Sequence, residues 1–206
     1  MSVYLQFGCG FDAPESWLNY DASPTLFFER IPFLGGLYTK NEKRFPKNVI
    51  WGDIAKGLPH QKGSVQGIFC SHILEHLCLE DCRQAIRNTY DYLSQGGIFR
   101  LVLPDLQQAI EQYTKNSNPE AARKFMETTL LGAVSRGSLA QRIMDSVFGN
   151  SKHQWMWDEK SLRHELEEAG FRKIRRAQFG DSKDPRFKEV ERESRFIHAL
   201  ALEASK

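Results

Sequence analysis

The stretch VYLQFGCGFDAPESWLNYD, residues 3–21, decides the fold predicted for this chain. A short apolar segment, Val3–Phe7, ends in Gly8-Cys9-Gly10, and a second apolar segment, Trp17–Tyr20, ends in Asp21. Glycines let backbone N–H groups come close to a ligand because no Cβ intervenes, and a carboxylate at the end of the next strand can accept both hydroxyls of a ribose. The pattern predicts a nucleotide-binding site in an open α/β sheet, with a plain glycine turn as the alternative.

Further apolar segments follow in the order that such a sheet requires. We expect strands at Asn48–Trp51, Val65–Cys70, Ile98–Leu103, Lys173–Phe179 and Phe196–Leu202. We expect helices at Leu79–Leu93, Leu106–Tyr113, Pro119–Leu131, Leu139–Phe148 and Asp158–Ala169. Strands that alternate with helices imply a parallel sheet with right-handed crossovers. The link from Gly10 to Trp17 is too short for a crossover helix, so we expect a single turn at Ala13–Ser16.

The predicted fold class is therefore α/β, a Rossmann-like, doubly wound domain that spans residues 1–206. Its seven-stranded sheet is expected to be mostly parallel, with an antiparallel last strand, because the polar link over residues 180–195 is too short to hold a crossover helix. Residues 106–152 carry more helices than one crossover requires. We expect them to form a helical insertion that caps a substrate pocket together with Ala22–Lys47.

Composition excludes several function classes. Lysine and arginine total 28 against 26 acidic residues, a net charge of +2, so we expect no nucleic-acid partner. No apolar run approaches the roughly 18 residues that span a bilayer, and no signal peptide is visible, so we expect no membrane span. The four cysteines, Cys9, Cys70, Cys78 and Cys82, are interpreted as reduced thiols of a cytoplasmic protein. The oligomeric state is left open.

The combined motifs resemble the class I S-adenosylmethionine-dependent methyltransferases, and specifically the small bacterial group of type 11-like predicted methyltransferases. The matching segments, beside Asp21, are LQFGCG (5–10), GDIAKGLP (52–59), SVQGIFCSHILEHL (64–77), LSQGGIFRLVLPDL (93–106) and HQWMWDEKSLRHELEEAGF (153–171). The resemblance implies S-adenosyl-L-methionine as methyl donor and S-adenosyl-L-homocysteine as product. It also implies a small-molecule or glycan-precursor acceptor.

The same resemblance assigns roles to individual residues. It implies that the glycine turn contacts the methionine part of the cofactor, that Asp21 contacts the ribose, and that Asp53 and Ile54 contact the adenine. The end of the fourth strand would line the floor of the cofactor site. The implied cofactor-binding residues are Gly8, Cys9, Gly10, Asp21, Asp53, Ile54, Cys70, Ser71 and His72. The chain departs from the family where Gln6 replaces an acid that contacts the ligand's ammonium group. Asp12 is the nearby carboxylate that could substitute for it.

The segment from His72 to His76 spells H-x-x-E-H, the pattern of some zinc peptidases. On a helix, His72 and His76 would share one face and could hold zinc. No strong third ligand is apparent, however, and the methyltransferase resemblance accounts for the segment, so we predict no metal. His72 and His153 are instead the expected acceptor-side residues, either of which could act as a general base.

Two other functions stay open at this stage. Gln6 and the missing first helix are compatible with a methyltransferase-fold binding or partner protein of weak or no activity. An NAD-dependent enzyme is disfavoured, because Ala13 stands where the last glycine of G-x-G-x-x-G belongs.

Overall fold

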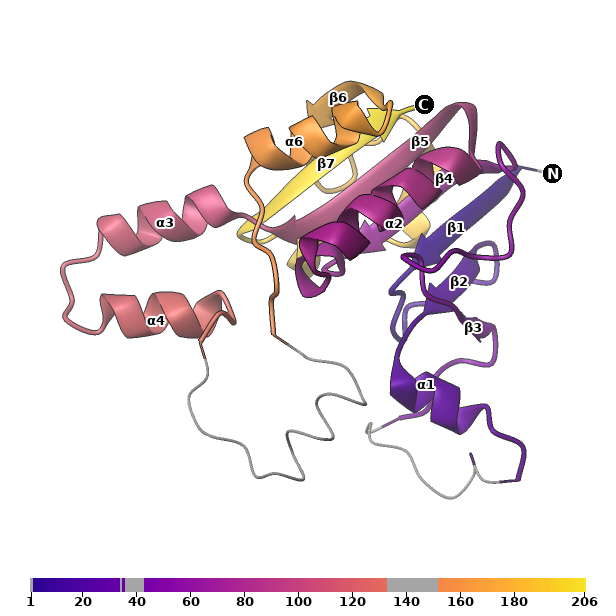
Figure 1. The fold of residues 1–206 in the computed structure, drawn as a ribbon, viewed down its shortest axis with the longest axis horizontal. Helices are drawn as coiled ribbons and strands as arrows, with labels where there is room; N and C mark the ends of the chain where they lie inside the picture. The colour runs from indigo at the N-terminus through magenta and orange to yellow at the C-terminus, as the bar shows by residue number, and fades with distance from the viewer. Residues whose placement is uncertain (1, 34, 36–42, 133–151) are drawn as a thin grey trace.

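The computed structural model describes residues 2–33, 35, 43–132 and 152–206. Its strands form one seven-stranded sheet in the order β3-β2-β1-β4-β5-β7-β6 (Figure 1). Strands β1 to β5 are parallel, and β7 is antiparallel to both of its neighbours. The predicted seven-stranded sheet with an antiparallel last strand is confirmed. The bounds are β1 Val3–Phe7, β2 Leu18–Asp21, β3 Val49–Trp51, β4 Val65–Ser71, β5 Leu93–Pro104, β6 Arg172–Arg176 and β7 Ala199–Ser205.

The described helices lie close to the expected ranges. They are α1 Pro24–Glu29, α2 Leu79–Tyr92, α3 Leu106–Thr114, α4 Ala121–Thr128 and α6 Glu159–Glu168, with short 3₁₀ turns η1 Leu74–His76, η2 Pro185–Glu189 and η3 Glu193–Arg195. Helix α6 begins where expected because Asp158 and Ser161 form a reciprocal capping box. The helix expected at Leu139–Phe148 lies outside the described residues.

One boundary was predicted incorrectly. The predicted strand starts at Ile98, but α2 stops at Tyr92 and Leu93 is already extended. Strand β5 therefore starts five residues earlier than expected and contains both glycines. Backbone hydrogen bonds join Gly96 and Gly97 to Lys206, so the far end of β7 holds this part of β5 in the sheet.

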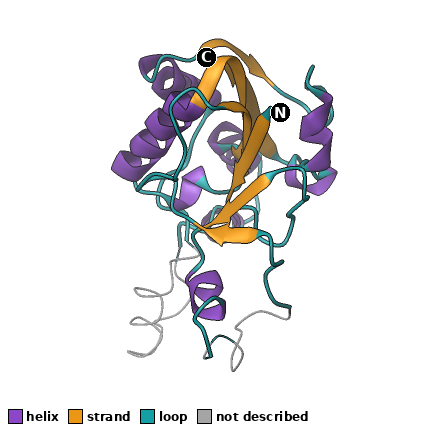
Figure 2. Cartoon of the chain, turned by 90° about the vertical axis from the view of Figure 1, so that its right-hand side faces the viewer, coloured by secondary structure: helices purple, strands orange, loops and turns teal. Residues whose placement is uncertain are grey.

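The two faces of the sheet are covered by different kinds of structure. On one face α2 and α6 pack against a large apolar core that includes Leu5, Ile68 and Leu101 (Figure 1). On the other face a smaller cluster forms around Trp17 and Phe187, which is contributed by η2 rather than by a long helix. Figure 2 shows the sheet between these two coverings.

The short link from β1 to β2 contains a turn and no helix. The Trp17 N–H donates to the Pro14 carbonyl, which closes a turn about one residue beyond the predicted one. The buried side chain of Gln6 donates to the Asp12 carbonyl and to Asn19 Oδ1, at 2.6 and 2.7 Å. Gln6 therefore serves to fix the link, since the missing helix leaves backbone groups that need hydrogen-bond partners.

A buried arginine anchors the chain that covers the second face. Arg100 on β5 is fully buried and pairs with Glu191 and Glu203, the latter at 2.9 Å. Its guanidinium also donates to the Gln178 carbonyl at 2.6 Å and lies 3.0 Å from Asp181. Gln178 and Asp181 precede η2 and Glu191 follows it, so the network fixes the path of the chain that continues to Arg192 and Arg195.

Helices α3 and α4 extend away from the sheet beyond the end of β5 (Figure 1). Asp105 caps α3 by accepting from the N–H groups of Gln107 and Gln108, as expected of a residue after Pro104. Strand β2, which precedes α1, is parallel to β5, so α1 and α3 both follow strands that end at the same edge of the sheet. In the described part of the chain, no helix has the length and apolar character needed to cross a membrane.

Candidate functional site

The strand order places one crevice at a position where α/β sheets bind ligands. From β1 the chain proceeds outward to β2 and β3 and then returns to β4 on the other side of β1. Ligands of open α/β sheets bind at such a switch point, outside the carboxyl ends of the strands. A small cavity lies there, and its lining includes Gly8 and Cys9 after β1 and Ser71 at the end of β4.

The glycine turn after β1 has the backbone form that its residues predict. Gly8 and Gly10 have φ values of +66° and +56°, in the left-handed region that favours glycine. An ideal Cβ on Gly8 would lie 2.0 Å from Ile73 Cδ1, so a larger residue would also clash there. Cys9 is buried, and this burial, followed by the charge of Asp21, raises the pKa of its thiol to about 12.

Asp21 joins the glycine turn to the end of β2. Its Oδ2 accepts from the Gly10 N–H at 2.9 Å and its Oδ1 accepts from the Ser23 N–H at 2.8 Å. The Gly52 N–H donates to the Asp21 carbonyl, so the chain that carries Asp53 lies beside it. Asp53 accepts from the Ala55 N–H and forms an ion pair with Lys56. The two predicted carboxylates are therefore neighbours along one edge of the sheet.

The residues expected to form the cofactor floor divide between the cavity and the core. Ser71 lines the cavity, and its buried Oγ has no hydrogen-bond partner among the described residues. Cys70 and Ile54 instead belong to the core on the α2 side and are almost fully buried. Their side chains therefore pack in the core beside the cavity and do not line it. A free hydroxyl in the cavity fits a polar ligand, because a buried polar group without a partner is costly.

Part of the protein itself covers the methionine end of the predicted site. Arg192 donates to Asp12 Oδ1 at 3.1 Å, across the mouth of the cavity, and Ile73 packs on Gly8. The cavity measures about 30 Å³, enough for one water molecule. The glycine turn, Asp21 and the Ser71 hydroxyl are groups of the kind that the resemblance requires for S-adenosylmethionine, and a ligand of that size would need the chain from Arg192 to Arg195 to lie further out.

Three histidines singled out in the sequence, His72, His76 and His153, gather with Glu75 beside the end of β4. His72 has a φ of +56° and no helix begins there, since only the 3₁₀ turn Leu74–His76 follows. The His72 Nε2–H donates to the Arg195 carbonyl at 3.0 Å, and its Nδ1 lies 3.3 Å from Glu75 Oε1. His76 and His153 stack edge to face with ring centroids 4.9 Å apart. The expected shared helix face of His72 and His76 is thus replaced by a cluster around Glu75.

The surroundings shift the pKa values of two of these histidines in opposite directions. Burial lowers the pKa of His153, although the charge of Glu75 opposes this effect. For His72, burial also acts to lower the pKa, but the interactions with Glu75 and the Arg195 carbonyl outweigh it, so the pKa is raised.

The segment before α6 places His153, Trp155 and Trp157 in different surroundings. Trp157 is buried against the end of β5, where it bridges to Asp105, while Trp155 is 42% exposed. The segment reaches η1 because the Glu75 carbonyl accepts from the N–H groups of Gln154 and Trp155. This pairing brings His153 next to His76.

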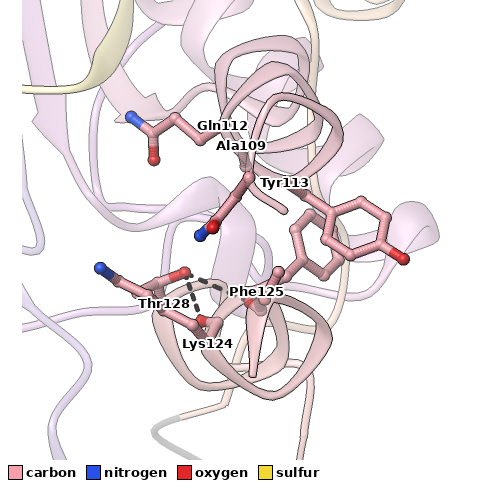
Figure 3. Close-up of a pocket in the computed structure, with 8 residues that line it drawn as sticks. Ala109, Gln112, Tyr113, Lys124, Phe125 and Thr128 are labelled. Atoms are coloured by element: carbon pink, nitrogen blue, oxygen red, sulfur yellow. Dashed lines mark hydrogen bonds between the residues drawn. The ribbon is translucent and has the colours of Figure 1, made fainter. Parts of the chain in front are cut away.

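A separate cleft of about 220 Å³ lies between α3 and α4 (Figure 3). Its walls include Tyr113 and Phe125, whose rings contact each other, and Thr128, whose hydroxyl donates to backbone carbonyls of its own helix. None of its lining residues belongs to the glycine turn or to β4. It is therefore distinct from the predicted cofactor site.

The chain is similar to known methyltransferases. Residues 5–101, slightly less than half of the chain, match the family model described as a methyltransferase domain. A search of the curated proteins found no match.

Solved structures of methyltransferases share the fold of this chain over almost its whole length. A S-adenosylmethionine-dependent methyltransferase from Archaeoglobus fulgidus aligns with a TM-score of 0.52 at 16% identity, over 100% of this chain and 86% of that one. One from Mesorhizobium loti aligns with a TM-score of 0.50 at 15% identity, over 99% and 90% of the two chains. These structures show the fold, and together with the family model they confirm the expected resemblance to class I S-adenosylmethionine-dependent methyltransferases. Methyl transfer with S-adenosylmethionine as cofactor is supported as the general type of reaction.

Sequence reasoning missed three residues of this region. Arg192 and Arg195 lie in a link that was interpreted only as polar and charged, although the buried Phe187 and Val190 within it signal a packed segment. Glu75 was interpreted as a helix residue, yet it is fully buried. An acid between two histidines in an otherwise apolar stretch was the available signal.

Proposed function

We propose that this protein transfers a methyl group from S-adenosyl-L-methionine to a small-molecule or glycan-precursor acceptor. The observation that carries the proposal is the hydrogen bond from the Gly10 N–H to Asp21. It sets a carboxylate and a glycine turn side by side at the switch point of the sheet, where a ribose and the adjoining methionine part would lie.

The cofactor would be held mainly by the residues that the family resemblance indicates. Asp21 keeps unused lone pairs for the ribose hydroxyls, because each of its oxygens accepts one backbone hydrogen bond. Asp53 would lie by the adenine. Ser71 would offer its free hydroxyl, and Gly8, Cys9 and Gly10 would support the methionine part. Asp12 would take the ammonium group once Arg192 releases it.

The acceptor would approach from the ends of β4 and β5, between His72, His153 and a cap that includes α3 and α4. A sulfonium is a good leaving group, so the main task of the protein is to align acceptor, methyl and sulfur. The Nε2–H of His72 is held by the Arg195 carbonyl and its Nδ1 faces the Glu75 carboxylate at 3.3 Å, and this favours a positioning role. The four cysteines form no disulfide, which supports a reducing compartment such as the cytoplasm.

Calorimetric titration with S-adenosylmethionine, S-adenosylhomocysteine and NAD tests the cofactor assignment. We expect the first two to bind and NAD not to bind. Asp21→Ala should weaken S-adenosylhomocysteine binding by roughly 1.5–3 kcal/mol, since a charged hydrogen-bond partner is lost.

Asp91→Ala is the matched control for this substitution. Asp91 is a carboxylate near the end of α2 and pairs with Lys62 at 2.9 Å. It lies where β5 begins, whereas the candidate site lies where the parallel strands end. Its removal should leave the dissociation constant unchanged. An equal effect of both substitutions, or none of Asp21→Ala, would show that Asp21 does not contact the ribose.

One observation favours a second candidate function, a methyltransferase-fold binding or partner protein with weak or no activity. The cavity of about 30 Å³ is closed by the contact of Arg192 with Asp12. A protein that keeps this state would bind neither S-adenosylmethionine nor S-adenosylhomocysteine, so the same titration separates the two candidates.

A further inference from the structure

Glu75 is a fully buried carboxylate that lacks adequate partners. Neither of its oxygens has a partner with hydrogen-bond geometry among the described residues. The nearest basic atoms are His72 Nδ1 at 3.3 Å and His76 Nε2 at 4.0 Å, both measured to Oε1. Burial of an ionised carboxylate costs several kcal/mol unless a cation or several hydrogen bonds compensate it. The structure thus presents a buried carboxyl group with one oxygen, Oε2, that has no polar partner among the described residues.

Two histidine nitrogens face the same place. One potential ligand atom from each of Glu75, His76 and His153 lies within 4.8 Å of the others. The His153 Nδ1 is buried and has no hydrogen-bond partner among the described residues. Three donors, of which two are buried without partners, therefore converge from η1 and from the segment before α6.

The hydrogen bonds of the neighbouring backbone prepare His76 for coordination. Its Nδ1 lies 3.2 Å from the Lys152 carbonyl, which can only accept, so Nδ1 carries the proton. The lone pair is then on Nε2, the atom that faces Glu75. Metal-binding histidines are usually held in one tautomer by such a hydrogen bond from the other ring nitrogen.

We propose that Glu75, His76 and His153 bind one divalent transition-metal ion of the zinc type. Two imidazoles and one carboxylate are typical zinc ligands, and they leave a fourth position for water or another ligand. With bonds of about 2.0 Å, tetrahedral donors lie about 3.3 Å apart, so the three side chains would close inward by about 1 Å. The ion would connect the end of β4 to the segment that leads into α6.

This inference differs from the sequence-based expectation of no metal, and it is independent of the proposed methyl transfer. The H-x-x-E-H spacing suggested His72 and His76 as the pair of ligands. In the structure the pair is His76 and His153, with Glu75 between them, and His72 turns its Nε2 away to the Arg195 carbonyl. The third ligand was not apparent because it lies 77 residues after His76 in the sequence.

Zinc binding to the full chain, after dialysis against a chelator, tests the proposal. We expect calorimetry with zinc chloride to give one site per chain, and zinc to raise the midpoint of thermal unfolding. Glu75→Gln and His153→Asn should each weaken zinc binding by about 10–100-fold or more, the loss seen when even a supporting partner of a ligand is removed.

Two control variants make the result specific. His164→Asn removes an exposed histidine of α6 and should bind zinc as the wild type does. Cys78→Ser removes the exposed thiol close to the cluster and should do the same. Glu75→Gln preserves the shape of the side chain, and circular dichroism of each variant before titration establishes that it is folded.

The proposal is overturned if the wild type binds zinc no more tightly than millimolar, or if Glu75→Gln and His153→Asn bind it as well as the controls do. It is also overturned if Cys78→Ser alone abolishes binding. Loss of zinc binding in Glu75→Gln and His153→Asn, with both controls intact, supports it whether or not S-adenosylhomocysteine binds.

Discussion

The glycine turn and the Glu75 cluster lie at the same end of the sheet, yet their polar groups are satisfied in opposite ways. At the turn, both oxygens of Asp21 accept backbone hydrogen bonds, and Asp12 is paired with Arg192. In the cluster, Glu75 and His153 have buried polar atoms without partners. At the first site the carboxylates are paired and only the Ser71 hydroxyl lacks a partner among the described residues, whereas the second site leaves a carboxylate and an imidazole nitrogen without partners. We therefore expect the first site to open when it binds a ligand, whereas the second already presents a set of ligand atoms.

The largest effect that sharpens this comparison should come from Arg100, which holds the chain that closes the first site. Arg100→Ala leaves Glu191 and Glu203 without their buried partner, so it should lower the free energy of unfolding by about 3–5 kcal/mol. Urea unfolding measures this loss. It should far exceed the loss for Arg83→Ala, which removes a more exposed pair with Glu165 that water and salt screen.

Equal losses in these two variants would contradict the idea that a buried ion network holds the closed segment in place. The closure would then depend on the apolar contacts of Phe187 and Val190 alone.

The sequence predicted those parts of the molecule that local physics determines. The buried strands and the helix that begins after Asp158 follow from a few neighbouring residues, and these predictions were confirmed. The position of Asp21 beside Gly10 follows from the parallel pairing of β1 and β2. A short motif could therefore predict both the fold and this part of the candidate site.

The rest depends on contacts between segments far apart in the chain. Arg192 meets Asp12 across 180 residues, and neither residue has a local pattern that indicates the other. His153 reaches His76 only because Gln154 and Trp155 donate to the Glu75 carbonyl. The boundary of β5 was missed for a related reason, since Gly96 and Gly97 form backbone hydrogen bonds with Lys206, the residue that follows β7, more than 100 residues away.

The next prediction in order of size concerns the rate at which iodoacetamide modifies Cys9 in the glycine turn. Burial, followed by the charge of Asp21, raises the pKa of Cys9 to about 12, so its thiol is protonated at neutral pH and should react slowly with iodoacetamide. Its rate should rise about tenfold per pH unit from pH 7 to 10 as the thiolate fraction grows. S-adenosylhomocysteine should slow the reaction further because it would cover the turn.

Cys78 is the internal control, because its side chain is exposed and it lies outside the turn. Peptide mass spectrometry should find it modified first, at a rate that S-adenosylhomocysteine does not change. If Cys9 reacts as fast as Cys78 at pH 7, the turn is not closed in solution, and the contrast between the two sites is lost.

The smallest expected effect concerns the contact that closes the first site. Arg192→Ala removes the ion pair with Asp12 without touching the predicted cofactor residues. Because the pair stabilises only the closed state, its loss should tighten S-adenosylhomocysteine binding, as any change does that raises the population of the binding-competent form. The pair is solvent-exposed and is worth about 0.2–1 kcal/mol, so the gain should not exceed about fivefold in the dissociation constant.

Two further variants decide what such a change means. Arg186→Ala removes an arginine of η2 that packs on Tyr4 rather than on Asp12, and it should leave binding unchanged. Asp12→Ala opens the same ion pair from the other side, but it also removes the carboxylate proposed to take the ammonium group. Arg192→Ala should therefore strengthen binding while Asp12→Ala weakens it. If both variants weaken binding, Arg192 contacts the ligand directly, and the first site presents its ligand atoms in the closed state just as the second one does.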